Sequence, residues 1–231
     1  MLLLYQEDDG FLFNSDSHYL YDFISKLNPK GNLLDVGCGC GIVGLLVARD
    51  FKINLYSIDI QPNNIVLTSN NARVNSLSCE SIKGDFLDKE FEKKFDFIIS
   101  NPPYYSDTVV KSENKKLHIS RYAQHLKLED FIRKSKKLLT NRGNLVFCYD
   151  AKEIDNIFSI CKENKLQIEN IRFVYGTKDK NSSLVFIHAR GSSKSNITIM
   201  PPLIATNRGE FSQEVKNIYL KTRTHSIKCK L

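Results

Sequence analysis

The sequence has 231 residues, of which 42% are hydrophobic, and a formal net charge of +7. This length favours one α/β domain with a sizeable core over two domains. No apolar stretch reaches the roughly 20 residues that span a bilayer. The N-terminus turns acidic at Glu7 and lacks the basic start of a signal peptide. We therefore expect no membrane association.

The cysteines and histidines show no metal-binding or disulfide pattern. The six cysteines are scattered, and several lie inside apolar runs, as buried thiols do. The five histidines show no HxxE or HxxxH spacing, so no metal is expected. A reduced, cytoplasmic protein is the interpretation that follows.

Helices and strands alternate along the chain. In chain order the patterns predict a helix at 17–27, a strand at 32–36, a helix from 42, a strand at 53–58, a helix at 62–75, strands at 79–83 and 95–100, a helix at 127–139, a strand at 144–149 after a turn at 141–143, a helix at 151–164 and strands at 167–175 and 183–189. This alternation indicates a Rossmann-like, doubly wound, mostly parallel sheet of seven strands. The short link at 176–182 favours a hairpin, so the last strand is expected to run antiparallel.

The chain is expected to fold as a single domain with three parts. Residues 1–30 are predicted to be a helical lead-in, 31–190 the Rossmann-like core, and 191–231 a basic C-terminal extension. The extension reads as a loop at 191–206 followed by a helix near 210–222.

Polar residues and glycines follow the predicted strands where each one ends. They are Asp35, Gly37, Gly39, Gly41, Asp59, Asp85 and Asn101. In an open α/β sheet, ligands bind outside the carboxyl ends of the strands, so these residues are expected to converge on one edge. The spacing Gly-x-Gly-x-Gly departs from the dinucleotide fingerprint GxGxxG because position 42 is Ile. Alternatively, the glycines form an ordinary strand-to-helix turn and Asp59 caps the next helix.

The segment Asn101-Pro102-Pro103-Tyr104 follows the apolar run at 95–100. Each proline fixes its own φ and donates no hydrogen bond, so the loop is stiff. It can hold a planar amine, with the Asn101 oxygen and a proline carbonyl accepting N–H bonds and Tyr104 stacking on the ring. A simple strand-end turn is the alternative interpretation.

Four segments in this order resemble a known family: Asp-Val-Gly-Cys-Gly-Cys-Gly at 35–41, Ile-Asp-Ile at 58–60, Gly-Asp-Phe at 84–86 and Ile-Ser-Asn-Pro-Pro-Tyr-Tyr at 99–105. They look like the class I S-adenosylmethionine-dependent methyltransferases of the amino-methylating NPPY group. Shorter matches at 13–16, 120–122, 201–204 and 209–212 resemble the bacterial tRNA1(Val) (adenine(37)-N6)-methyltransferases.

The resemblance implies a role for each strand-end residue. The three glycines would pass under the methionine part of S-adenosylmethionine, Asp35 would lie near its amino group, Asp59 on its ribose and Asp85 at its adenine. Asn101 and the Pro102 carbonyl would hold the acceptor amine, and Tyr104 would stack on the base. The implied substrate is the exocyclic N6 of adenine in tRNA.

The positive charge favours a polyanionic partner. Residues 111–142 carry a net charge of +7 and residues 191–231 a net charge of +5, so the rest of the chain is acidic. Candidate RNA contacts are Lys115, Lys116, Arg121, Tyr122 and Arg208. A solvated lysine-rich helix face is the alternative for each segment.

Two other activities remain open because Asn at position 101 does not distinguish one planar amine from another. One is methylation of a glutamine amide in a protein of the release-factor type, although only about 30 residues precede the first predicted strand. The other is methylation of guanine N2 in ribosomal RNA. A basic RNA-binding protein with a degenerate cofactor fold is the non-enzymatic alternative.

Overall fold

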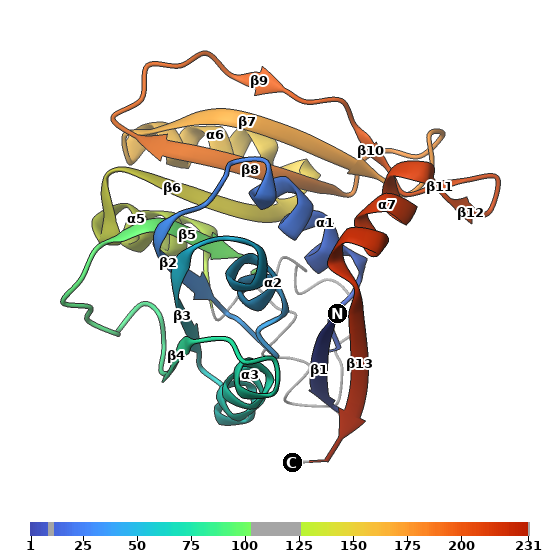
Figure 1. Cartoon of the computed structure of the whole chain (residues 1–231). Helices are drawn as coiled ribbons and strands as arrows, with labels where there is room; N and C mark the ends of the chain where they lie inside the picture. Colours follow the sequence, from blue (N-terminus) through green and yellow to red (C-terminus); the bar gives the residue numbers. More distant parts are fainter. Residues whose placement is uncertain (9–11, 103–125, 231) are drawn as a thin grey trace.

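The structure is a computed structural model that describes residues 1–8, 12–102 and 126–230. Its centre is a β-sheet with helices on both faces (Figure 1). The long strands of this sheet are β2 (Gly31–Val36), β3 (Ile53–Asp59), β4 (Cys79–Lys83), β5 (Phe95–Ser100), β6 (Leu139–Asp150), β7 (Leu166–Tyr175) and β8 (Leu184–Gly191). The two-residue strands β9 (Thr198–Ile199) and β10 (Leu203–Ile204) extend the edge beside β7.

The strand order is β10-β7-β8-β6-β5-β2-β3-β4, with β9 also paired to β7. β8 is antiparallel to both β6 and β7, whereas the strand pairs from β6 to β4 are parallel. The predicted doubly wound, mostly parallel sheet with an antiparallel last strand is therefore confirmed, together with the hairpin between β7 and β8. Within the described ranges the sheet has nine strands rather than seven, because the two short edge strands also pair with β7.

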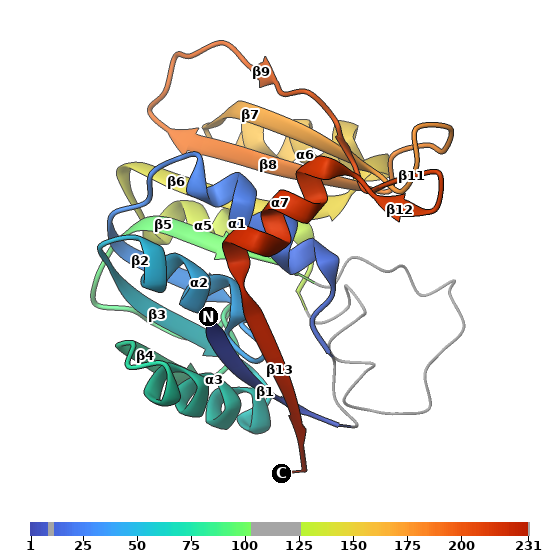
Figure 2. The ribbon, with the colours of Figure 1, turned by 45° about the vertical axis from the view of Figure 1, so that its right-hand side comes forward.

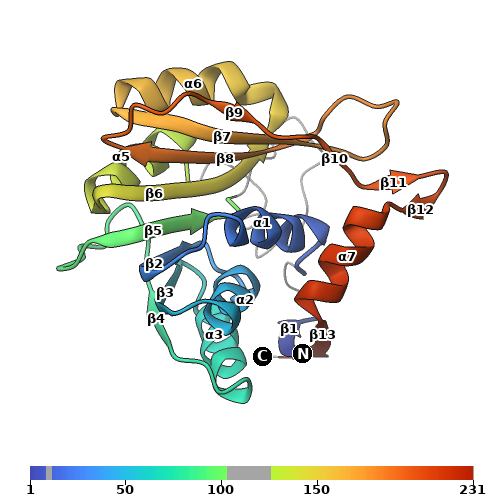
Figure 3. The same ribbon diagram turned by 45° about the horizontal axis from the view of Figure 1, so that its top comes forward.

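Helices connect the parallel strands and form the outer layers. They are α1 (Ser15–Ser25), α2 (Ile42–Asp50), α3 (Pro62–Val74), α5 (Leu128–Leu138), the short η2 (Ala151–Glu153), α6 (Ile154–Glu163) and α7 (Gln213–Thr222). α1, α2 and α3 lie on one face of the sheet, and α5 and α6 on the other (Figure 3). In the described residues, no helix is long and apolar enough to cross a membrane.

The sheet separates two hydrophobic cores. Leu33 and Leu34 are neighbours on β2, and because strand side chains alternate they pack into opposite cores. Both are fully buried, which is worth about 1.5–3 kcal/mol for each leucine. On α5, Leu128, Phe131 and Ile132 are buried at the spacing of one helix face. The sheet and its helices thus form one rigid support for the strand ends.

A second, two-stranded sheet joins the two ends of the chain. β1 (Leu2–Glu7) pairs in parallel with β13 (Thr224–Cys229), as Figure 2 shows. The side chains of Asn71 on α3 and of Asn75, which caps the end of α3, bond to the backbone of β1, with Oδ1 of Asn71 2.8 Å from the Tyr5 nitrogen. Neither strand was predicted from the sequence, which indicated only a helical lead-in before the core. Neither strand has a local signal, because its partner lies at the other end of the chain.

Two further details differ from the predictions. Residues 141–143, predicted as a turn, belong to β6, which pairs with β5 at Leu139 and again from Asn144 onward, with a register shift between. The C-terminal helix α7 begins at Gln213, where the Ser212 side chain accepts a hydrogen bond from the Val215 nitrogen. A hairpin of β11 (Thr206–Asn207) and β12 (Glu210–Phe211) precedes it. The division of the chain at 30 and 190 remains a prediction.

Candidate functional site

The carboxyl ends of β2, β3 and β5 open onto one cavity with about 1020 Å³ of empty space, part of it open to solvent. Six of the residues that the sequence singled out line it: Asp35, Gly37, Gly39, Asp59, Asp85 and Asn101. Gly41 and Pro102 are not among the lining residues. The structure therefore brings the strand-end residues together on one edge, and their individual roles remain predictions.

The glycine loop between β2 and α2 forms an open floor. Gly37 and Gly39 have φ angles of 68° and 57°, and a Cβ atom added to either would meet nothing within 4 Å. Gly41 has a different environment, because its added Cβ would lie 2.9 Å from a side-chain carbon of Thr68. It precedes α2 as the N-cap residue with φ 83°. Gly37 and Gly39 thus leave room for a ligand, whereas Gly41 lets the helix pack closely against α3.

Two buried carboxylates stand beside this floor. Asp35 is 3% exposed, and its Oδ2 accepts a hydrogen bond of 3.0 Å from the Gly44 nitrogen in α2. Burial, with a smaller contribution from the charge of Asp59, raises the pKa of Asp35 from 3.8 to about 7. A nearby cation would lower that pKa, so the cavity favours a positively charged ligand next to Asp35.

Asp59 at the end of β3 also orders the glycine loop. Its Oδ2 accepts a hydrogen bond of 2.9 Å from the Gly39 nitrogen, and its Oδ1 accepts one of 2.8 Å from the Gln61 nitrogen. Burial raises the pKa of Asp59, and the hydrogen bonds to its carboxylate oppose that shift. Asp59 therefore both faces the cavity and holds Gly39 in its left-handed conformation.

Asp85 and Phe86 form the wall that follows β4. The Asp85 carboxylate accepts a hydrogen bond of 2.8 Å from the Leu87 nitrogen, which fixes the turn. Phe86 is 4% exposed, and its ring packs at a tilt against that of Phe131 of α5, with ring centroids 5.9 Å apart. An acceptor beside an aromatic wall is suited to a planar ring that carries an amine, such as adenine.

Asn101 follows β5 and lines the same cavity. Its Oδ1 accepts a hydrogen bond from the Cys148 thiol of β6, with 2.8 Å between oxygen and sulfur. The next residue, Pro102, is buried. Pro103 and Tyr104 lie outside the described residues, so the amine grip predicted for the full Asn-Pro-Pro-Tyr loop remains a prediction.

The N-terminal segment supplies a wall of the cavity through Phe13 and Ser17. The Phe13 ring packs on the edge of His18, which in turn contacts Tyr219 of α7, with ring centroids 5.6 and 5.0 Å apart. Burial lowers the pKa of His18 to about 4, so this ring is neutral near pH 7. The wall is thus packed, through neutral aromatic contacts, against the C-terminal helix.

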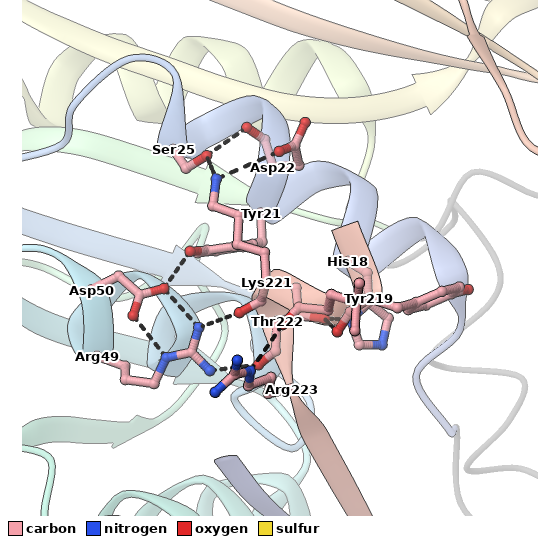
Figure 4. A network of polar contacts seen from close by, with 11 residues as sticks. His18, Tyr21, Asp22, Ser25, Arg49, Asp50, Tyr219, Lys221, Thr222 and Arg223 are labelled. Atoms are coloured by element: carbon pink, nitrogen blue, oxygen red, sulfur yellow. Dashed lines mark hydrogen bonds and ion pairs between the residues drawn. The ribbon is translucent and has the colours of Figure 1, made fainter. Parts of the chain in front are cut away.

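Polar contacts fasten α7 to α1 and α2, as Figure 4 shows. Nδ1 of His18 lies 3.0 Å from Oγ1 of Thr222, and the Arg49 guanidinium donates to the carbonyl oxygens of Lys221 and Thr222. The Lys221 ammonium lies 2.6 Å from the Ser25 hydroxyl. Through this network the C-terminal extension holds α1, and with it the cavity wall, in place.

None of the predicted RNA-contact residues is among the described residues that line the cavity. Lys115, Lys116, Arg121 and Tyr122 lie outside the described residues. Arg208 is exposed at the turn between β11 and β12, where its φ is 51°, and it does not line the cavity.

Several cavity residues were missed by the sequence analysis as candidates: Phe13, Ser17, Ile60, Gln61, Asn64, Phe86 and Leu126. Ile60 and Phe86 directly follow residues that were singled out, and Gln61 lies two residues after Asp59, so their position in the chain was a usable signal. Ser17 and Asn64 reach the cavity only through the packing of α1 and α3. All six cysteines are free thiols, and among the described residues no group of three or more His, Cys, Asp or Glu side chains is arranged to hold a metal ion.

The residues that line the cavity fit S-adenosylmethionine in their chemistry. Gly37 and Gly39 leave open space, Asp35 favours a neighbouring cation, and Asp59 and Asp85 provide acceptors at the ends of β3 and β4. Asn101 lines the same space and can therefore receive an acceptor group next to the bound cofactor.

Known proteins resemble this chain in sequence. A tRNA1(Val) (adenine(37)-N6)-methyltransferase from Actinobacillus pleuropneumoniae is 31% identical over 129 residues, which are 54% of this chain and 53% of that protein. The chain thus matches about half the length of that relative. A protein of the same name from Parabacteroides distasonis is 25% identical over 82% of this chain and 83% of its own length. A release factor glutamine methyltransferase from Flavobacterium psychrophilum is 29% identical over 63% of this chain and 57% of its own length.

The fold also has solved counterparts, and a family model covers most of the chain. The crystal structure of a predicted O-methyltransferase from Agrobacterium tumefaciens superposes with a TM-score of 0.70 at 16% identity, covering 91% of this chain and 98% of that one. The model of the methyltransferase small domain matches residues 14–159, which contain the glycine loop and all the strand ends of the cavity. The chain therefore belongs to the methyltransferase small domain family and has the fold of solved methyltransferases, which together imply S-adenosylmethionine as its cofactor.

Proposed function

We propose that this protein methylates the exocyclic N6 of an adenine in tRNA, with position 37 of tRNA1(Val) as the expected target. One observation carries the proposal: Asn101 lines the same cavity as the open floor at Gly37 and Gly39. A cofactor on that floor and an amine at Asn101 would be neighbours. The names of the Actinobacillus and Parabacteroides relatives support adenine in tRNA as the owner of that amine.

When bound, S-adenosylmethionine would supply the methyl group of its sulfonium: the N–C bond to the amine would form as the C–S bond breaks, leaving S-adenosylhomocysteine, and the proton of the amine would pass to water. The protein's part is to present the nitrogen. An aromatic amine is a weak nucleophile because its lone pair is delocalised into the ring. Asn101 Oδ1 and the Pro102 carbonyl would accept its two N–H bonds and favour a pyramidal nitrogen whose lone pair faces the methyl group. Positioning and electrostatics then provide most of the rate acceleration.

The remaining predicted roles belong to this proposal. Asp35 would lie beside the amino group of the cofactor, Asp59 at its ribose and Asp85 at its adenine. Tyr104 would stack on the target base, which offsets part of the cost of removing that base from its own stack. The basic residues at 115, 116 and 121 would contact phosphates. The reaction is expected to take place in the cytoplasm.

A second candidate is methylation of a glutamine amide in a release factor. It is favoured by the Flavobacterium relative of that name and by the chemistry of Asn101, which accepts N–H bonds from an amide as readily as from adenine. Methylation of guanine N2 in ribosomal RNA would use the same acceptor oxygens.

The deciding experiment is nucleoside mass spectrometry of tRNA from a strain that lacks the gene. The proposal predicts the loss of N6-methyladenosine from tRNA and its return when the wild-type gene is supplied. Unchanged tRNA together with a lost methyl group in ribosomal RNA or in a release factor would replace this proposal with the corresponding alternative.

A further inference from the structure

The Asn101 carboxamide is held by one neighbour in the described part of the chain. The Cys148 Sγ atom lies 2.8 Å from Asn101 Oδ1, and no other described residue forms a hydrogen bond with the Asn101 side chain. The last χ angle of asparagine has broad, shallow preferences, so the side chain does not fix its own orientation. Among the described residues, the contact with Cys148 is therefore the one that orients the carboxamide of this cavity residue.

The pairing of β5 with β6 explains why these two residues meet. The strands are parallel, and Ser100 is the register partner of Phe147. Asn101 directly follows β5, and Cys148 is the next residue on β6. Register partners on adjacent strands point to the same face, so the two side chains emerge side by side at the point where β5 ends.

The environment of the Cys148 thiol favours hydrogen-bond donation over a role as a thiolate. Cys148 is fully buried, and it is not among the residues that line the cavity. Burial, followed by the charge of Asp16, raises the pKa of Cys148 well above its ordinary value, so the sulfur keeps its proton. A protonated thiol donates to the oxygen of a carboxamide, which turns Oδ1 rather than Nδ2 toward β6.

We propose that Cys148 is a positioning residue, whose thiol fixes the orientation of the Asn101 carboxamide for methyl transfer. A carbonyl oxygen has two lone pairs, so Oδ1 can accept from Cys148 and still accept one N–H bond from the target amine. The inference rests on the proposed function of Asn101. It extends that function, because a residue of β6 would hold in place the Asn101 oxygen that accepts the N–H bond of the amine.

Three substitutions separate the hydrogen bond from packing. Cys148→Ser keeps a donor, Cys148→Ala removes it, and Cys148→Val removes it while filling the space. Turnover is measured as methyl transfer from S-adenosylmethionine to unmodified tRNA. We expect kcat to fall by about fivefold in the Ala and Val variants, the equivalent of one hydrogen bond, and to be largely restored in the Ser variant. Cofactor affinity, measured by calorimetry, is expected to stay unchanged.

A matched control is Cys161→Ala. Cys161 is 1% exposed on α6 and also carries a thiol with a raised pKa, but it does not line the cavity. Its substitution is expected to lower the melting temperature without changing kcat. The inference is overturned if Cys148→Ala turns over like the wild type, or if the Ser, Ala and Val variants lose turnover equally, which would show a packing role.

An infrared measurement tests the contact without turnover. The S–H stretching band that disappears in Cys148→Ser is expected at a lower frequency than that of a free thiol, and it is expected to shift back in Asn101→Ala. A band at the free-thiol frequency in the wild type overturns the inference. If the band is shifted but Asn101→Ala retains full turnover, the contact stands, the proposed role of Asn101 fails, and the positioning role of Cys148 fails with it.

Discussion

Lowering the pH is expected to weaken the binding of S-adenosylmethionine because Asp35 takes up a proton. Burial raises the pKa of Asp35 to about 7 in the free protein. The proposed neighbour of Asp35 is the cationic amino group of the cofactor, which favours the ionised carboxylate. If only the ionised form binds, the fraction available falls by about 25-fold between pH 7.5 and pH 5.5, and affinity falls with it. Below about pH 7, binding therefore releases a proton.

The raised pKa of Asp35 also makes the stability of the folded protein depend on pH, in the opposite direction to cofactor binding: stability falls as the pH rises. The folded-state pKa of Asp35 lies above its ordinary value of 3.8, so the folded protein holds a proton that the unfolded chain releases. The contribution of this proton to stability is complete below pH 3.8 and is lost as the pH rises through about 7. In the absence of cofactor, Asp35→Asn is expected to remove that loss and to raise the melting temperature near neutral pH.

The affinity for S-adenosylmethionine is measured by calorimetric titration from pH 5.5 to pH 7.5. This range lies below the pKa of a free α-amino group, about 7.7 to 8.0, so the amino group of the cofactor stays mostly charged. Asp59 lines the same cavity and also has a raised pKa, so it could cause a similar pH dependence of cofactor affinity. The variant Asp35→Asn shows which of the two carboxylates is responsible. This variant is expected to bind weakly with an affinity that changes little over the range. A flat affinity in the wild type, or an equally steep one in Asp35→Asn, would refute the reasoning.

Three further predictions concern the floor of the cavity and the basic segment. Gly37→Ala is expected to lower the free energy of unfolding by about 1 kcal/mol, because the alanine would have to adopt a left-handed backbone conformation. It is also expected to weaken cofactor binding, because the added Cβ would occupy open space on the floor of the cavity. Gly41→Ala is expected to lower the melting temperature further, because its Cβ would also lie 2.9 Å from Thr68; equal melting temperatures in the two variants would contradict this. Replacing three basic residues with Ala is expected to weaken tRNA binding and to reduce the slope of log K against log salt by up to about 3, and unchanged filter binding would leave them as a solvated surface. These residues are Lys115, Lys116 and Arg121.

The central sheet could be predicted from the sequence because its signals are local. The strands β2, β3 and β5 are short, largely apolar runs, and β2, β4 and β5 are followed at once by glycine or asparagine, while β3 ends in Asp59. The structure places all four strands within one residue of the predicted bounds. The convergence of their ends follows from the topology of a parallel sheet. The cavity around Asp35, Asp59 and Asn101 was therefore predictable.

Features that depend on distant contacts could not be predicted. The β1–β13 pair joins Leu2 to Thr224, so neither strand has a turn or partner nearby in the chain. Gly37 and Gly41 look alike in sequence, and only the packing of α3 against Gly41 separates their roles. The contact between Cys148 and Asn101 depends on the register of β5 and β6, which the sequence does not define.

The most direct test of the account is methyl transfer by the purified protein to tRNA isolated from the deletion strain. With S-adenosylmethionine present, nucleoside mass spectrometry is expected to show N6-methyladenosine with the wild-type protein. Asn101→Ala is expected to bind the cofactor with near-normal affinity and to form none. Equal amounts of N6-methyladenosine from both proteins would contradict the role of Asn101, and its absence with the active wild-type protein would contradict adenine in tRNA as the substrate.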